Sequence, residues 1–188
     1  EYRGLWAHDA VDGSTLSRAL KQHLVAERVR LPHARILFVR RNERRSRDGL
    51  LAYVARSTQS GRELRCLELE RYDDLIGLDL ATAGALVDHP LFLVCTHGKH
   101  DRCCAKFGRP LYEAVREQVE DGWACQSSHL GGDRFAGNLV VLPEGVYLTY
   151  LRQSGARFEL RGVAQSSTRV SSFMRNIDAS QWLADPTL

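Results

Sequence analysis

Residues 91–104 read LFLVCTHGKHDRCC, and this stretch decides the fold that the sequence predicts. Its first four residues form a short, uninterrupted apolar run, which is typical of a strand buried on both faces of a sheet. A helix is predicted from Arg109 or Pro110 to about Glu120, because proline is favoured in a first turn and apolar residues then recur along one side. The stretch therefore predicts a buried strand that leads through a loop into a helix.

The residues after this helix complete a definite order of elements. We predict a strand over 123–128, a hairpin formed by 139–142 and 146–150 around a Pro-Glu-Gly turn, and a C-terminal helix over 171–183. Residues 152–188 otherwise show little periodicity. The order strand, helix, strand, hairpin and helix is that of a thioredoxin-like unit.

The first half of the chain repeats this order weakly. A helix capped by Ser14 is predicted to run to about Arg30. Three strands bounded by glycines and an arginine-rich loop follow it, over 35–40, 50–55 and 64–70. We therefore predict an α/β, thioredoxin-like fold made of two pseudo-related β-α-β-β-(α) halves with mixed sheets, a divergent half over 1–89 and a ferredoxin half over 90–188.

The composition excludes several classes of protein. The chain has 188 residues, of which 44% are hydrophobic and 26% charged, so it is neither disordered nor collagen-like. Its longest apolar run is far shorter than the roughly 18 residues that span a bilayer, and we expect a soluble, cytoplasmic protein without membrane contact. A net charge of +3 gives no reason to expect a nucleic-acid partner. The basic run 40–47 is interpreted as a solvated loop, with docking of an acidic redox partner or an anion as the alternative.

The cysteines are the most informative residues. Four of the five fall within thirty-one residues, beside three histidines: Cys95, Cys103, Cys104 and Cys125, with His97, His100 and His129. An odd, clustered set in a chain of this length argues against a disulfide scaffold and favours metal binding or redox chemistry. Cys66 stands apart in a predicted strand and is interpreted as a small buried hydrophobe.

Two loops offer metal ligands. Cys95 ends the buried strand and Cys104 returns after eight intervening residues, so one loop supplies two thiolates. His129 and Asp133 flank a Leu-Gly-Gly segment after the next strand, where the backbone can pass close to a bound group. Cys95, Cys104, His129 and Asp133 therefore make a four-ligand set.

The two loops resemble those of a known family. The stretches 93–104 (LVCTHGKHDRCC) and 127–138 (SSHLGGDRFAGN) look like the sucrase/ferredoxin-like family, a branch of the thioredoxin-like [2Fe-2S] ferredoxins. The resemblance implies a [2Fe-2S] cluster used for one-electron transfer, held in fungal members by two cysteines and by the histidines of a His-x-Gly-Gly-His motif. Cys95, Cys104 and His129 match that pattern, whereas Asp133 stands where the second histidine is expected.

The fourth ligand is open on the sequence alone. A carboxylate is a hard ligand and suits a cluster less well than thiolate or imidazole. Cys103 lies next to Cys104, and Cys125 precedes His129 by four residues, an offset of about 13 Å along an extended strand. We rank Asp133 first, Cys103 second and Cys125 third.

Neighbouring polar residues are expected to support the ligands. His97 and His100 are interpreted as hydrogen-bonding neighbours, because metal sites commonly recruit them. Lys99 and Arg102 would lower thiolate pKa values and raise a cluster's potential, and Arg134 could pair with Asp133.

The sequence favours an electron carrier over an enzyme. It contains no glycine-rich nucleotide motif and no Cys-x-x-Cys, so we expect it to depend on partner proteins for its chemistry. The resemblance implies an iron-sulfur protein whose redox partners are a reductase and an acceptor enzyme. Two alternatives remain: a thiol-dependent oxidoreductase that uses Cys95 or Cys104 as nucleophile, and a structural zinc module with the same ligands.

Overall fold

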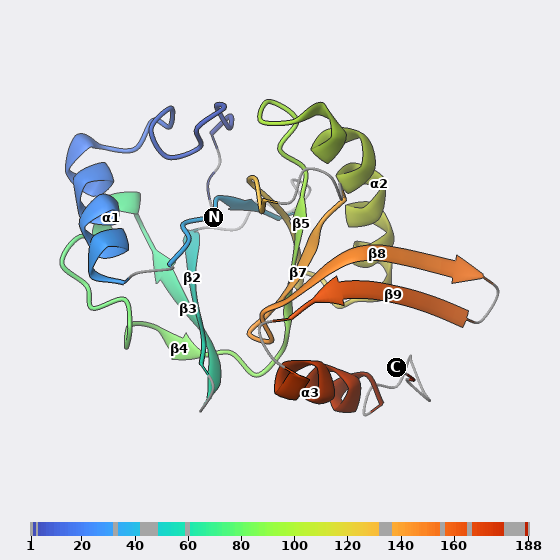
Figure 1. Cartoon of the computed structure of the whole chain (residues 1–188). Coiled ribbons are helices and arrows are strands. Elements are labelled where there is room, and N and C mark those ends of the chain that lie inside the picture. Colours follow the sequence, from blue (N-terminus) through green and yellow to red (C-terminus); the bar gives the residue numbers. More distant parts are fainter. Residues whose placement is uncertain are drawn as a thin grey trace.

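Two sheets organise the chain (Figure 1). The computed structural model describes residues 2, 4–31, 34–41, 49–58, 61–131, 137–154, 157–164, 167–178 and 187. The larger sheet has six strands in the order β1-β6-β5-β7-β8-β9, and the smaller has three in the order β2-β3-β4. This mixed α/β architecture confirms the predicted class and is compatible with a thioredoxin-like fold.

The larger sheet contains the predicted strand-helix-strand-hairpin order. Its strands are β1 (Val39–Arg40), β5 (Leu91–Cys95), β6 (Ala124–Ser127), β7 (Leu139–Leu142), β8 (Val146–Ser154) and β9 (Arg157–Val163). Helix α2 (Arg102–Gln118) connects β5 to β6, which run parallel. β7 pairs antiparallel with β5 and forms a hairpin with β8, and helix α3 (Ser167–Asp178) follows β9.

The two faces of this sheet are covered by different parts of the chain. Side chains alternate between faces along a strand. Leu93 and Cys95 of β5 pack in one core cluster with Leu64, which belongs to the smaller sheet. Val94 lies on the opposite face and packs in a second cluster with Tyr112 of α2. Cys95 is therefore the last residue of β5 on the sheet face that packs against the first half of the chain.

The first half builds the smaller sheet and one covering helix. Its elements are α1 (Arg18–Arg30), β2 (Leu50–Ser57), β3 (Arg62–Leu69), the 3-10 helix η1 (Tyr72–Leu75) and β4 (Ala85–Leu86). All three strands pair antiparallel. Leu20 of α1 is fully buried and packs with Phe38 in a third core cluster. This cluster holds α1 against the rest of the chain.

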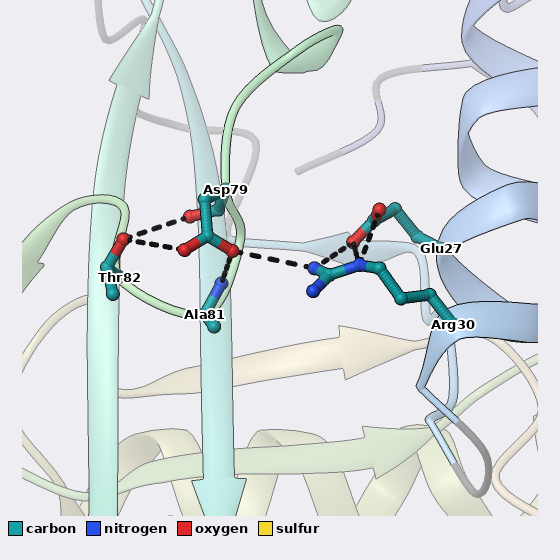
Figure 2. A network of polar contacts seen from close by, with 5 residues as sticks. All are labelled: Glu27, Arg30, Asp79, Ala81 and Thr82. Atoms are coloured by element: carbon teal, nitrogen blue, oxygen red, sulfur yellow. Dashed lines mark hydrogen bonds and ion pairs between the residues drawn. The ribbon is translucent and has the colours of Figure 1, made fainter.

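Polar contacts connect the end of α1 to the turn after η1 (Figure 2). Arg30 bonds Glu27 one turn earlier and reaches Asp79 at 3.5 Å, while Asp79 accepts hydrogen bonds from Ala81 N–H and the Thr82 hydroxyl. The hydrogen bond from Arg30 lowers the pKa of Glu27, and the one from the Ala81 backbone lowers that of Asp79. Exposed ion pairs contribute little to stability, so these contacts fix the local geometry rather than the fold.

Two predicted helix starts are wrong. The first helix begins at Arg18 because Ser17, rather than Ser14, accepts the Leu20 N–H; the Ser14 hydroxyl bonds back to Val11. The second begins at Arg102 rather than near Pro110, because Asp101 caps it and the proline is accommodated inside. No helix among the described residues is long and apolar enough to cross a bilayer.

The strand predictions differ in extent. The strand expected over 35–40 is reduced to β1, which pairs with β6 of the larger sheet instead of joining the smaller one. β9 lies where the sequence showed little periodicity, and α3 begins before the predicted residue 171. The smaller sheet is antiparallel rather than mixed. The division near residue 89 into two pseudo-related halves stays a prediction.

Candidate metal centre

Cys95 lies at the carboxyl end of β5, where the strand leaves the core. Its side chain is fully buried, and its backbone N–H donates to the Asn138 carbonyl at 2.9 Å. The next residue, Thr96, donates its N–H to the Ser127 carbonyl at 3.1 Å. Backbone bonds on both sides therefore hold the end of β5 between β6 and the start of β7.

Cys104 lies in the first turn of α2. The Asp101 side chain accepts the Cys103 N–H at 2.6 Å, and the Asp101 carbonyl accepts the Cys104 N–H at 3.1 Å. One turn further on, Gly108 packs against the strand so closely that a Cβ there would come 1.8 Å from the Cys95 carbonyl oxygen. Only glycine allows this contact, which fixes the start of α2 against the end of β5.

His129 follows β6 in a short segment with several attachments. Before it, Ser128 donates its N–H to the Phe38 carbonyl at 2.7 Å and accepts the Phe38 N–H on its hydroxyl at 3.0 Å. After it, the Leu130 carbonyl accepts a bond from Arg35 at 2.6 Å. Gly131 has a φ of +87°, a conformation that favours glycine, and its carbonyl accepts from the Asn138 amide.

Three side chains from these segments converge. Nδ1 of His129 lies 3.9 Å from Sγ of Cys95 and 3.7 Å from Sγ of Cys104, and the three donor atoms all lie within 4.8 Å of one another. The two thiols are buried and the imidazole is half-buried. Two ligands on one tetrahedral zinc ion, at about 2.3 Å for sulfur and about 2.0 Å for nitrogen, lie about 3.5 Å apart. This Cys-Cys-His group can therefore hold a metal ion with little rearrangement.

A chain of histidines surrounds the group. His97 is 2% exposed; its Nε2 lies 2.7 Å from the Ala7 carbonyl, and its Nδ1 accepts the His129 N–H at 3.2 Å. Burial lowers the pKa of His97, which keeps the ring neutral. The His100 ring stacks on His129 with centroids 3.8 Å apart, and the exposed His8 stacks on His100 at 4.8 Å.

Comparison with known proteins places the chain in a family. The model of the sucrase/ferredoxin-like family matches residues 3–169. The chain belongs to the sucrase/ferredoxin-like family. The two motifs that carry the resemblance, 93–104 and 127–138, lie within the matched region and contain the Cys-Cys-His group.

Another relative covers only a small part of the chain. The type IV pilus inner membrane component PilN of Pseudomonas aeruginosa strain PAO1 is 53% identical over 48 residues, which are 26% of this chain and 24% of PilN. The chain thus spans about a quarter of the length of that curated relative. No solved structure matches the chain.

The other residues singled out from the sequence lie at various distances from the group. Lys99, Arg102 and Cys103 are exposed, and neither Cys103 nor Cys125 joins the three donors. Cys125 is buried on β6 opposite Leu93, one alternation back along the same sheet face as Cys95. Asp133 and Arg134, and residues 42–47 of the basic run, lie outside the described residues.

The N-terminal segment contacts the candidate site in a way that the sequence does not predict. Trp6 packs edge-on against His97 at 5.6 Å, Ala7 binds the same ring, and His8 extends the histidine stack. These residues precede their partners by about ninety positions in the sequence. No local sequence pattern predicts a contact over that separation. A tryptophan and a histidine near one end of the chain were the only signal.

Proposed function

We propose that the chain is an iron-sulfur electron carrier that binds a [2Fe-2S] cluster through Cys95, Cys104 and His129. The observation that carries the proposal is the convergence of two buried thiols and one imidazole from three separate segments. Thiolates and imidazole are the ligands that [2Fe-2S] clusters use in proteins. Cys95, Cys104 and His129 would hold the cluster, which would supply one-electron transfer between a reductase and an acceptor enzyme.

The chain's own residues would control both access and potential. Burial of the two cysteines keeps water from their sulfurs, and a dry environment strengthens every charge interaction at the site. A neutral histidine in place of a thiolate makes the site less negative, which favours a higher reduction potential than four cysteines would give. Asp133 remains our first choice for the fourth ligand, since neither Cys103 nor Cys125 joins the three donors.

An acidic protein is the partner that the site's surroundings favour. Arg102 and Lys106 are exposed in the first turns of α2, which has no acidic residue in its first turn. The cation of Arg102, at the first position, opposes the positive end of the helix dipole and costs about 0.3–1 kcal/mol; Lys106 lies in the second turn, beyond most of this effect. In the described part of the chain neither forms an ion pair. A positive charge that destabilises the helix beside a functional site has an explanation if it attracts a negatively charged reductase or acceptor.

A zinc site is the second candidate, and a specific observation favours it. The sulfur-to-nitrogen distances of 3.7 and 3.9 Å are close to the separation of two ligands on one tetrahedral ion. Structural zinc would stabilise the contact between α2, β5 and the His129 segment without any electron transfer.

Metal analysis of wild-type and variant protein tests the proposal. Protein purified without oxygen, or reconstituted with iron and sulfide, should contain about two iron and two sulfide per chain and give an electron paramagnetic resonance signal after reduction. Cys95→Ser and Cys104→Ser should lose the cluster, whereas Cys125→Ser, equally buried but outside the group, and Cys66→Ser should keep it. Colourless protein with one zinc per chain after reconstitution would establish the second candidate instead.

A further inference from the structure

Ser127 carries a buried hydroxyl that has no hydrogen-bond partner among the described residues. The residue is the last of β6 and is fully buried. A buried hydroxyl without a partner destabilises a protein, and native structures contain few. Such a group indicates either a bound molecule that satisfies it or a functional demand on that position.

The register of the sheet places Ser127 beside the candidate ligands. It is the Cα partner of Cys95 on the parallel strand β5 and of Val39 on the antiparallel strand β1. Directly paired residues project their side chains from the same face of a sheet. Val39 has no polar atom in its side chain, so the polar neighbour of the Ser127 hydroxyl in this row is the thiol of Cys95.

The adjacent serine shows what a satisfied hydroxyl looks like at the same strand end. Ser128 is also buried, at 2% exposed, but its hydroxyl accepts the Phe38 N–H at 3.0 Å. The two serines are consecutive and both are shielded from solvent. Of the two, only Ser127 is paired with a candidate ligand, Cys95, on the neighbouring strand. The Ser127 hydroxyl, unlike that of Ser128, therefore does not hold the backbone in place.

We propose that the Ser127 hydroxyl donates a hydrogen bond to a sulfide of the cluster bound through Cys95. The inference rests on the proposed function and adds a residue that sets the potential. A reduced cluster carries one more negative charge than an oxidised one, so a donor to its sulfur stabilises the reduced state and raises the reduction potential. Low polarity around the bond strengthens it.

The test is the reduction potential of reconstituted Ser127→Ala and Ser127→Thr proteins, with Ser17→Ala as the control. Loss of the Ser127 hydroxyl should lower the potential, and Ser127→Thr, which keeps a hydroxyl, should restore most of the shift. Ser17→Ala is the control: it removes the hydrogen bond that caps α1, outside the segments that carry the candidate ligands, and should leave the potential unchanged while lowering the urea midpoint.

A second readout needs no cluster. Because the hydroxyl lacks a partner in the protein alone, metal-free Ser127→Ala should have the same urea midpoint as wild type or a higher one. A clearly lower midpoint would show a structural partner and overturn the inference, as would an unchanged potential in Ser127→Ala. Failure of wild-type protein to take up iron and sulfide would instead overturn the proposed function, which separates the two outcomes.

Discussion

His97 holds His129 through the main chain: the backbone N–H of His129 donates to Nδ1 of His97 at 3.2 Å. Because Nδ1 accepts, Nε2 must carry the ring proton, and it donates to the Ala7 carbonyl at 2.7 Å. Burial lowers the pKa of this ring and favours the neutral form that the pattern requires. One buried imidazole therefore ties the segment with the third metal donor to the N-terminal segment.

Two amide substitutions separate the two bonds of His97. An asparagine amide reaches about as far as Nδ1 and should keep the bond to His129, whereas a glutamine amide reaches about as far as Nε2 and should keep the bond to Ala7. We expect His97→Gln to weaken metal binding by about 10- to 100-fold, the usual cost of losing a group that orients a ligand, and His97→Asn to weaken it less. Competition with a chelator measures both, and equal losses would contradict the assignment.

Gly108→Ala should damage the site from a position that binds nothing. Alanine favours helix over glycine by about 1 kcal/mol, so an unconstrained site would gain stability. Here the new methyl would clash with the Cys95 carbonyl oxygen, and we expect a loss of about 1–3 kcal/mol together with weaker metal binding. Gly61→Ala, which meets no atom within 4 Å, is the control in urea unfolding. A stabilised Gly108→Ala would show that α2 can move away from β5.

The structure brings together three of the candidate ligands predicted from the sequence, whereas several elements around them differ from the prediction. Cys95, Cys104 and His129 were predicted from two loops, and the structure gathers them because β5 and β6 are parallel and end at the same edge. α2 begins at Arg102 rather than near Pro110, because Asp101 caps the helix there and the proline is accommodated inside it. Contacts of His97 with Ala7, and the register of Ser127 with Cys95, depend on tertiary packing and leave no local pattern.

Arg102→Glu should stabilise the helix and weaken docking at the same time. A glutamate in the first turn suits the helix dipole, so we expect unfolding to cost about 1 kcal/mol more. Association with an acidic plant-type ferredoxin, used as the probe, should slow by about tenfold at low salt and lose much of its salt dependence. Arg18→Glu is the control, because Arg18 is exposed at the first position of α1 and should give only the stability gain. Equal slowing in both variants would indicate a general charge effect.

Cys66 and Cys103 should differ sharply in reactivity toward iodoacetamide. Cys103 is exposed, whereas Cys66 is half-buried and burial raises the pKa of its thiol. The thiolate is the reactive form, so at pH 8 a raised pKa leaves Cys66 with less thiolate than an ordinary cysteine, and its alkylation should quicken further as the pH rises toward 10. We expect Cys103 to be modified first, Cys66 slowly, and the three buried cysteines only after unfolding.

A hydrogen bond from Tyr53 lowers the pKa of Cys66 and so partly offsets the effect of burial. Tyr53→Phe should therefore slow the alkylation of Cys66, measured by mass spectrometry. Faster labelling in that variant would refute this account.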